Sequence, residues 1–481
     1  MNAGATSPIL VVSAAGVLCI LLSVLPDRRL ARALPTFVAA GAILAAGILS
    51  GVLWGPAQTA YSGNLLVNKF SLLLNFVFLS AALATVALSW REPASVDRRG
   101  EYVGLLLLST TGMMMVAGAG TMIVLFLGVE LLSVALYVLC ALEVWRERSL
   151  ESGLKYLIIG AIGSSIFLYG LALLYGATGT TELPAVGRAL AASGLGDDPL
   201  TIAAMALIVV GLGFKASAVP FHMWTPDVYE GAPTPITAFM ATATKAAALG
   251  AFLLVFNGSL PDLRHDWRAA IAAVATATIV VGNVAALTQS NLKRLLAYSG
   301  IAQAGYLLIG VAAGTVDGVE AVLYYLFAYL AMTIAAFAVV VVREREVEDG
   351  DSVAALAGYG RARPVLGIVM TLAMLSLAGF PPLTGFIGKF LIFGSAVDAG
   401  MTWLAIVGVV GSMVSLGYYL RVVGVMWLRE PDPARSRKML RLPGAVGGVA
   451  IVSAASVVGL AFGASLVLDA CRAAAQALLS I

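Results

Sequence analysis

The chain has 481 residues, of which 60% are hydrophobic and 11% are charged, and its mean hydropathy is +0.96. Because soluble domains carry about 25% charged residues, this composition excludes a soluble globular protein and indicates a polytopic membrane protein. The formal net charge of +3 gives no indication of nucleic-acid binding.

Apolar runs of the length needed to cross a bilayer, about 20 residues, follow one another along the chain. They predict fourteen transmembrane helices, approximately at 7–25, 34–54, 67–90, 102–118, 120–142, 153–176, 200–230, 233–256, 269–288, 297–313, 318–342, 364–397, 402–427 and 443–468. The first run lacks a basic leader and a convincing cleavage site, so we interpret it as a retained span and not as a signal peptide. The least distinct boundary lies at 118–120, between the fourth and fifth spans.

The distribution of lysine and arginine orients these spans. With the N-terminus outside, nineteen of the 29 basic residues fall in inward loops and five fall in outward loops. The other five lie within spans and are Lys155, Lys215, Lys245, Lys389 and Arg421. Since cytoplasmic loops are enriched in basic residues, the pattern predicts that both termini lie outside.

No part of the chain is predicted to form a soluble domain. The longest loops, at 178–199 and 343–363, are too short for a nucleotide-binding fold, because one βαβ unit alone takes about 30 residues. Cys19, Cys140 and Cys471 stand far apart and lie in no cysteine–histidine cluster, which disfavours an iron–sulfur or zinc site. We therefore expect no cofactor and no metal in this chain, and we expect redox chemistry on a partner.

Four ionisable residues lie near the middle of predicted spans, and they are Glu130, Lys215, Lys245 and Lys389. A charge at a helix centre costs about 2.5–3.5 kcal/mol on insertion scales. A structural ion pair or a side chain that snorkels to the interface explains one such residue. Lys245, however, has about a dozen apolar or small residues on either side, which is too far for snorkelling. The set therefore predicts a hydrated proton path.

Lysine suits a proton relay because burial disfavours the charged ammonium and a nearby carboxylate favours it. Movement of Glu130 toward or away from Lys215 would switch that lysine between holding and releasing a proton. The remaining membrane charges are given structural roles. We interpret Lys155 as a residue near the end of its span, and Arg421 as an anchor, because a guanidinium does not readily deprotonate.

Two spans are interrupted by prolines close to these lysines. Pro220 and Pro226 follow Lys215 in the seventh span, and the segment LAGFPPLTGF at 377–386 precedes Lys389 in the twelfth. Irregular backbone at membrane depth is tolerated only where protein or water satisfies it. Paired interruptions in two halves of a transporter indicate the ion site.

This pattern predicts an all-α polytopic membrane protein with about 14 transmembrane helices, two inverted five-helix repeats, and discontinuous helices 7 and 12. Residues 1–101 would hold helices 1–3. The first antiporter-like half would be 102–256, with helices 4–8, and the second would be 269–427, with helices 9–13. A loop and helix 14 would complete the chain at 428–481.

His222 lies inside the first interruption. A lone histidine is usually structural, but the ordinary pKa of histidine is near physiological pH, so His222 is a candidate for the proton path. Asp227 and Glu230 follow on the inward side of the break. We expect Asp227 to cap the loop, and the role of Glu230 stays open.

Three segments together resemble a known family. They are GFKASAVPFHMWTPDVYEGAPTPITAF from 213, NLKRLLAYSGIAQAGYLLIG from 291 and LAGFPPLTGFIGKF from 377. They are similar to the subunit N family of bacterial NADH–quinone oxidoreductase, respiratory complex I, across residues 60–430. The VYEGAPTP ending distinguishes this family from the L- and M-type subunits and from cation/proton antiporter subunits. Lys389 also matches it, because subunit N is expected to carry lysine in the twelfth span.

The resemblance implies a role for each membrane charge. Glu130 and Lys215 resemble the carboxylate–lysine pair, Lys245 the central relay lysine, and Lys389 the lysine that exchanges protons with the far side. It implies a proton-translocating subunit of the bacterial inner (plasma) membrane that carries no redox cofactor itself. NADH, FMN, iron–sulfur clusters and quinone are expected on partner subunits. The expected neighbours are the A, H, J, K, L and M types, with the lipid bilayer around them and no nucleic acid.

One position departs from the family pattern. In AYSGIAQAGY this chain has Gln303 where the family often has histidine. A glutamine can bind a water but cannot carry a proton. Proton uptake from the inward side through this position is therefore in doubt.

Three other functions compete with a complex I pump. A subunit of a multi-subunit sodium–proton antiporter is disfavoured by VYEGAPTP and Lys389. The same subunit could serve a membrane hydrogenase or another dehydrogenase, and the sequence does not separate these because the electron-input module lies elsewhere. A purely structural scaffold is disfavoured by the four mid-span charges.

Overall fold

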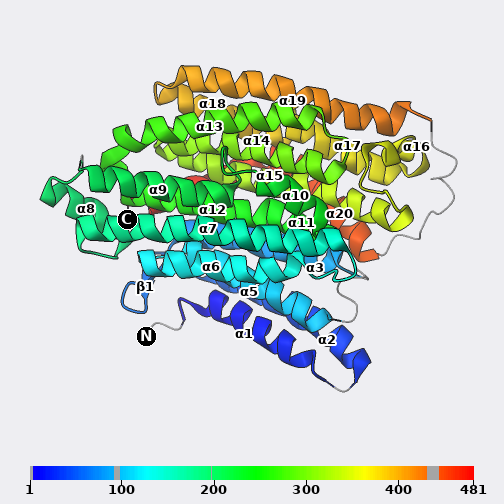
Figure 1. Cartoon of the computed structure of the whole chain (residues 1–481), viewed down its shortest axis with the longest axis horizontal. Coiled ribbons are helices and arrows are strands. Elements are labelled where there is room, and N and C mark those ends of the chain that lie inside the picture. Colours follow the sequence, from blue (N-terminus) through cyan, green and yellow to red (C-terminus); the bar gives the residue numbers. More distant parts are fainter. Residues whose placement is uncertain (1–3, 26, 91–97, 197, 431–443, 481) are drawn as a thin grey trace.

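The computed structural model describes residues 4–25, 27–90, 98–196, 198–430 and 444–480. Within these ranges the chain is a bundle of helices aligned with the long axis of the molecule (Figure 1). Twelve of the described helical stretches are long and apolar enough to cross a membrane. The short apolar helix α1 and the broken pair α17–α18 supply the remaining two of the fourteen predicted crossings.

The N-terminal helices are α1 (Ser7–Leu22), α2 (Arg28–Val52) and α3 (Lys69–Leu88). Between α2 and α3, a short hairpin of β1 (Gln58–Ala60) and β2 (Leu65–Val67) was not predicted. Its turn places Tyr61 and Ser62 at positive φ. Helix α3 begins with a capping box, in which Asn68 accepts from the Ser71 N–H and the Ser71 hydroxyl accepts from the Asn68 N–H.

The first half of the bundle carries the first break. Its helices are α5 (Arg99–Ala117), α6 (Met122–Cys140), α7 (Glu147–Thr178), α8 (Leu183–Ser193), α9 (Pro199–Ala216), α10 (Trp224–Gly231), α11 (Thr234–Phe239), the π-helical η1 (Met240–Thr244), α12 (Lys245–Phe252) and the π-helical η2 (Leu253–Ser259). The predicted split at 118–120 is confirmed, since α5 ends before it and α6 begins after it. The loop at 178–199 contains the additional helix α8.

The second half carries the second break. Its elements are η3 (Pro261–Leu263), α13 (Arg264–Leu287), α14 (Leu292–Ala313), α15 (Val316–Glu346), η4 (Val353–Leu356), α16 (Tyr359–Ala362), α17 (Pro364–Ala378), α18 (Thr384–Asp398) and α19 (Thr402–Leu428). Helices α9 and α17, which precede the two breaks, run in opposite directions along the bundle (Figure 1). The seventh span is interrupted between α9 and α10, and the twelfth is interrupted between α17 and α18. The predicted discontinuous helices 7 and 12 are therefore confirmed.

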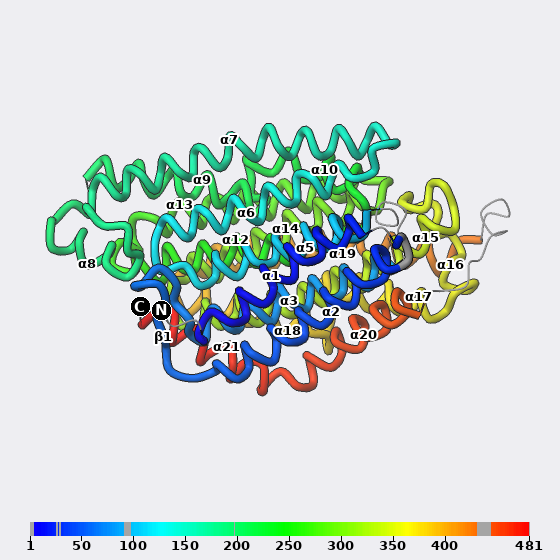
Figure 2. The backbone as a smooth tube through the Cα atoms, turned by 90° about the horizontal axis from the view of Figure 1, so that it is seen from below, coloured from blue at the N-terminus to red at the C-terminus, as the bar shows by residue number. Residues whose placement is uncertain are grey.

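The C-terminal segment differs from the single helix predicted for it. The structure has α20 (Gly444–Phe462) and α21 (Ala464–Leu479), which meet at Gly463. Five basic residues were predicted for the preceding inward loop. Four of them, at 435–441, lie outside the described residues. The start of α1 and the end of α21 both lie beside the hairpin at one end of the bundle (Figure 2).

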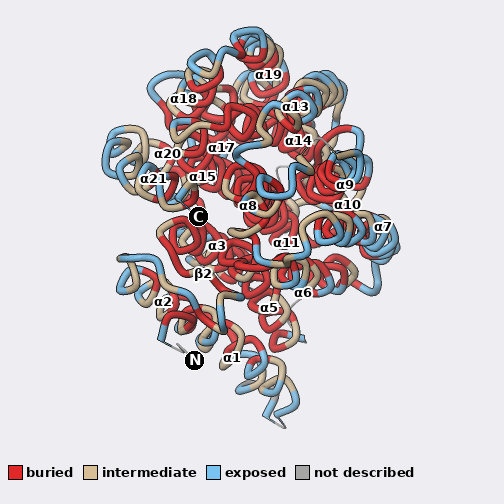
Figure 3. Tube along the Cα trace, turned by 90° about the vertical axis from the view of Figure 1, so that its left-hand side faces the viewer, coloured by how far each residue is buried: buried red, intermediate tan, exposed pale blue. Residues whose placement is uncertain are grey.

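The core is centred on three helical segments. In the stretch Thr234–Ser259 every residue except Gly258 is buried, and most residues of α14 and α15 are buried, whereas only a minority of the described residues of the outer helices α2 and α20 are buried. Figure 3 shows the buried residues gathered around α15 and α11, with exposed residues on the periphery. The division into two halves with the boundaries 102–256 and 269–427 stays a prediction. Lys245 lies in the first of these central segments, and the Lys389 ammonium lies 4.7 Å from the ring centre of Tyr306 on α14.

Candidate functional site

Lys215 is the penultimate residue of α9 and is 5% exposed. Ser217, which follows the helix, has a left-handed φ of 61° and redirects the chain away from the helix axis. The Lys215 ammonium donates to the hydroxyl of Ser133 on α6 at 2.6 Å. Its position in the last turn of a helix is favourable for a cation, because the C-terminal end of the helix dipole is negative.

Aromatic rings surround the same ammonium. Lys215 Nζ lies 5.7 Å from the ring centre of Tyr137, 5.3 Å from that of Tyr156 and 5.1 Å from that of Phe214. Trp224, just beyond the break, stacks on Tyr156 at 4.6 Å. A desolvated cation over aromatic faces gains about 2 kcal/mol. The three rings therefore offset part of the cost of burying the charge.

Glu130 lies on the same face of α6 as Ser133, which binds the Lys215 ammonium. Glu130, Ser133 and Tyr137 are spaced i, i+3 and i+7, which places them side by side on one helix face. Glu130 acts electrostatically on Lys215, but within the described residues no direct ion pair joins them. One buried oxygen of Glu130 has no protein partner. The Ser133 hydroxyl, which accepts from Lys215, donates to the Val129 carbonyl of its own helix.

Lys389 occupies an equivalent electrostatic position at the second break. It lies on α18, after the break, but its side chain reaches back to the end of α17 and is 3% exposed. Its Nζ donates to the carbonyls of Leu377 and Ala378, at 2.9 and 3.2 Å, and to the hydroxyl of Ser412 at 2.8 Å. Both broken-helix ammonium groups thus sit at the C-terminal end of the first half-helix.

Lys245 begins α12 and faces α14 and α15. It is 1% exposed, and its ammonium has no protein hydrogen-bond partner in the described structure. A Cβ added at Gly300 of α14 would lie 2.7 Å from Lys245 Nζ and 2.9 Å from the hydroxyl of Tyr329 on α15. The absence of a side chain at Gly300 therefore brings these two groups to the same small space.

Gln303 connects the region of Lys245 to that of Lys389. Its Nε2 donates to the Leu377 carbonyl at 3.1 Å and to the Tyr419 hydroxyl at 3.2 Å, and its Oε1 accepts from Tyr325 at 2.5 Å. Because a carbonyl only accepts, the atom that faces Leu377 must be the amide nitrogen. Both amide hydrogens are then used, so Gln303 fixes the direction of this network and does not itself pass a proton.

His222 lies in the segment between α9 and α10 and is half-buried. Its neighbours Pro220 and Met223 are exposed, and Met223 is 76% exposed. Among the described residues, His222 makes no hydrogen bond or ion pair with Glu130 or with the three lysines. The structure does not bring His222 into contact with Glu130 or with the three buried lysines. Its role in the proton path therefore stays a prediction.

A network of ion pairs lies at the end of the bundle where α7 and α14 begin, which we call the basic end. Asp227 of α10 pairs with Lys155 at 2.8 Å and with Arg294 at 2.7 Å, and Glu230 pairs with Arg294 at 2.9 Å and with Arg148 at 3.6 Å. The expectation that Asp227 caps the loop is wrong, because Asp227 lies within α10 and its carboxylate joins α10 to α7 and α14 through the two ion pairs. Glu230 binds α7 and α14 as well, through Arg148 and Arg294.

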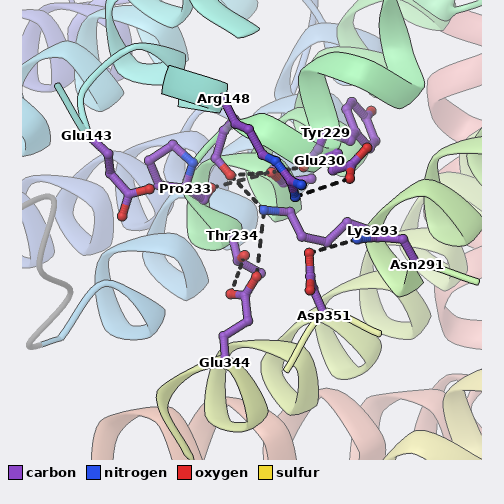
Figure 4. Close-up of polar contacts among 12 residues, drawn as sticks. Glu143, Arg148, Tyr229, Glu230, Pro233, Thr234, Asn291, Lys293, Glu344 and Asp351 are labelled. Atoms are coloured by element: carbon purple, nitrogen blue, oxygen red, sulfur yellow. Dashed lines mark hydrogen bonds and ion pairs between the residues drawn. The ribbon is translucent and has the colours of Figure 1, made fainter. Parts of the chain in front are cut away.

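A second part of this network is buried more deeply. Lys293 of α14 is 1% exposed and approaches Glu344 of α15, whose carboxylate also accepts from Thr234 (Figure 4). The predicted spans 269–288 and 297–313 leave Lys293 in the loop between them, whereas α14 begins at Leu292, so the sequence did not indicate this site. The available signal was Asn291, a favourable N-cap residue directly before Leu292.

Two remaining groups have structural contacts. Arg421 of α19 donates to the carbonyls of Leu287 and Gln289, so it ties α19 to the end of α13. The three cysteines are buried and free. Within the described residues, no group of three or more His, Cys, Asp or Glu residues is arranged to hold a metal ion.

Two oppositely directed broken helices with buried lysines at their breaks define an antiporter-like membrane subunit. The model of the family described as "NADH:quinone oxidoreductase/Mrp antiporter, TM" matches residues 119–415. A relative from Salinibacter ruber named NADH-quinone oxidoreductase subunit N is 46% identical, over 86% of this chain and 85% of its own length. The chain therefore belongs to the family of subunit N proteins of NADH–quinone oxidoreductase.

Solved structures agree with this assignment. The fold matches a chain of respiratory complex I from Thermus thermophilus with a TM-score of 0.83 and 34% identity, over 97% of this chain and 99% of that one. It also matches a chain of the Mrp complex from Dietzia with a TM-score of 0.84, over 100% of both chains. At 22% identity, the likeness to the Mrp chain indicates a shared fold alone.

Proposed function

We propose that this chain translocates protons through Glu130, Lys215, Lys245 and Lys389 as a membrane subunit of a bacterial complex I. The observation that carries the proposal is the placement of both break lysines. Lys215 lies in the last turn of one half-helix and the Lys389 ammonium binds the last carbonyls of the other, and neither charge has a carboxylate ion pair in the described structure. A lysine held in this way can give up its proton when its surroundings change.

The relay would work by changing the distance between Glu130 and Lys215. An approach of the carboxylate stabilises the ammonium, and a retreat leaves an amine buried among aromatic rings, which favours loss of the proton. The proton would pass to Lys245 and then to Lys389, which would release it on the far side. Ser133, one helical turn from Glu130 on α6, would hold the Lys215 ammonium beside the path of the carboxylate.

The proposal gives this subunit no redox role of its own. NADH, FMN, iron–sulfur clusters and quinone would be held by partner subunits, and the A, H, J, K, L and M types would be its membrane neighbours. The basic end would face the cytoplasm, which places both termini outside. An ion-exchanging antiporter without a redox partner is the weaker alternative, since its support is the shared fold.

The assembly is tested by purifying the tagged chain in mild detergent and recording an optical spectrum and an NADH–quinone oxidoreductase assay. We expect flavin and iron–sulfur absorbance and NADH oxidation in the co-purified complex. A colourless complex of small hydrophobic subunits would instead indicate the antiporter. A coloured complex that does not oxidise NADH would indicate a different electron donor.

Glu130→Ala is expected to lower the number of protons translocated per electron, because Lys215 then loses the carboxylate that acts on its charge. Glu130→Asp should be milder, since it keeps the charge one methylene further away. The measurement is proton translocation in membrane vesicles, normalised to NADH oxidation. An equal loss in both variants would mean that Glu130 supplies a geometry and not a charge.

A further inference from the structure

We propose that Lys293 and Glu344 form a proton-uptake site at the basic end that supplies Lys245 along the contact of three helices. The inference deepens the proposed function and rests on it. It assigns to these residues the uptake step, which glutamine at position 303 cannot carry through its own side chain. The transported species at the site is a proton taken from water.

The geometry places one titratable group near water and its partner inside the protein. The Glu344 side chain is 25% exposed, and that of Lys293 is 1% exposed. Lys293 Nζ donates to the Ala232 carbonyl at 2.8 Å and lies 3.7 Å from one Glu344 oxygen, while the other oxygen accepts from Thr234 at 2.5 Å. Figure 4 shows both acidic and carbonyl partners converging on the Lys293 ammonium.

A neighbouring ion pair shows what a purely structural arrangement looks like in this protein. Glu346, two residues further on α15, is fully buried and is held by Arg343 at 3.2 Å and Arg363 at 2.8 Å. Arginine does not readily deprotonate, so that cluster holds fixed charges. The pair of Lys293 and Glu344 consists of two groups that can both exchange protons, and its 3.7 Å separation is longer than a charge-assisted hydrogen bond of about 2.8 Å.

The same three helices build this site and the surroundings of Lys245. Helix α14 supplies Lys293 and α15 supplies Glu344 at the uptake site. Further inside, α14 supplies Gly300 and α15 supplies Tyr329 beside Lys245. The buried segment Thr234–Ser259 supplies Thr234 at one end and Lys245 further inside. Lys293 and Gly300 are seven residues apart and hence on one face of α14, about 10 Å apart along the axis.

Polar groups are available between the two sites. Thr333 lies one turn from Tyr329 on α15, on the side toward Glu344, and is 3% exposed. Thr237 is fully buried and donates to the Tyr229 carbonyl at 3.1 Å, which leaves its oxygen free to accept. The Lys245 ammonium at the inner end is buried without a protein partner, as expected for a group that receives its proton through water.

The proton step balances within the pair. Lys293 passes one proton inward and becomes a neutral amine. Glu344 takes one proton from water and passes it to that amine, which restores the carboxylate and the ammonium. Each cycle therefore moves one proton from the surface toward Lys245 and leaves the charge of the site unchanged.

The test uses the intact complex in membrane vesicles and measures protons translocated per NADH oxidised. Glu344→Gln keeps an acceptor for Thr234 but cannot exchange protons, and we expect the same loss of pumping as for Lys215→Ala. Glu344→Asp should restore most of the pumping, which loss of a merely structural contact does not predict. The matched control is Asp317→Asn, which removes the exposed pair with Arg472 on α21 and should pump like the parent.

A second pair of variants decides the question if Glu344→Gln prevents assembly. Thr234→Val removes the hydroxyl that binds Glu344, and Thr234→Ser keeps it, so only the valine variant should pump less. Parent-level pumping in Glu344→Gln, or equal pumping in the two Thr234 variants, would overturn the inference while a loss in Lys215→Ala still supports the proposed function. Parent-level pumping in Lys215→Ala would overturn the proposed function itself.

Discussion

Lys215→Ala is expected to remove the proton translocation carried by this subunit while the complex still assembles. The variant deletes a buried charge, which relieves a cost of about 2.5–3.5 kcal/mol, and removes the contacts of that charge with the aromatic rings, which are worth about 2 kcal/mol, while the Ser133 hydroxyl still donates to the Val129 carbonyl. These terms nearly cancel, so the fold should persist. The measurement is protons translocated per NADH oxidised in vesicles, together with the amount of assembled complex.

The Lys215→Arg variant distinguishes the need for a positive charge from the need for a side chain that can release a proton. Arginine keeps a cation at the end of α9 but does not readily release its proton, so we expect the pumping of this variant to match that of the alanine variant. Parent-level pumping in Lys215→Ala would support a structural scaffold. Restored pumping in Lys215→Arg would mean that a fixed positive charge is sufficient, which contradicts a relay.

Gly385→Ala is expected to displace the second broken helix and to lower pumping as strongly as loss of Lys389 itself. A Cβ at Gly385, in the first turn of α18, would overlap the carbonyl oxygen of Ser376 near the end of α17. Since this neighbour is backbone, the half-helices must separate, and overpacking of this kind costs about 1–3 kcal/mol. The Lys389 ammonium depends on the Leu377 and Ala378 carbonyls beside that contact.

The same helix provides the control for this prediction. Gly394 of α18 has no atom within 4 Å of an added Cβ, so Gly394→Ala should assemble and pump like the parent. Thermal stability of the complex and protons per electron are measured for both variants. Equal behaviour of the two would show that the approach of α17 and α18 at Gly385 is not required.

Much of the fold follows from the amino-acid sequence, because membrane spans are long and their apolar runs are unambiguous. The two breaks were predicted from Pro220, Pro226 and the FPPL segment, since proline cannot donate to the helix. The four buried charges were identified for a related reason, namely that a charge in an apolar run needs an explanation. Their roles as proton carriers stay predictions.

Other features depend on contacts between distant segments. The sequence places Lys389 after its break and Lys215 before its own, and only the path of the Lys389 side chain makes the two sites equivalent. The π-helical turns around α12, the β1–β2 hairpin and the interruption at Gly463 have no strong local signal. The Lys293–Glu344 site joins residues fifty-one positions apart in the chain, so periodicity alone does not indicate it.

The burial of every residue of the segment Thr234–Ser259 except Gly258 has a consequence for the medium in which Lys245 operates. The surrounding helices enclose the side chain of Lys245, so the solvation of its ammonium is set by the dipoles and hydroxyls of those helices. The energy of the charge at Lys245 is then independent of the thickness and composition of the hydrocarbon around the bundle. The protein itself provides the polar surroundings of this charge, and the bilayer contacts the outer helices.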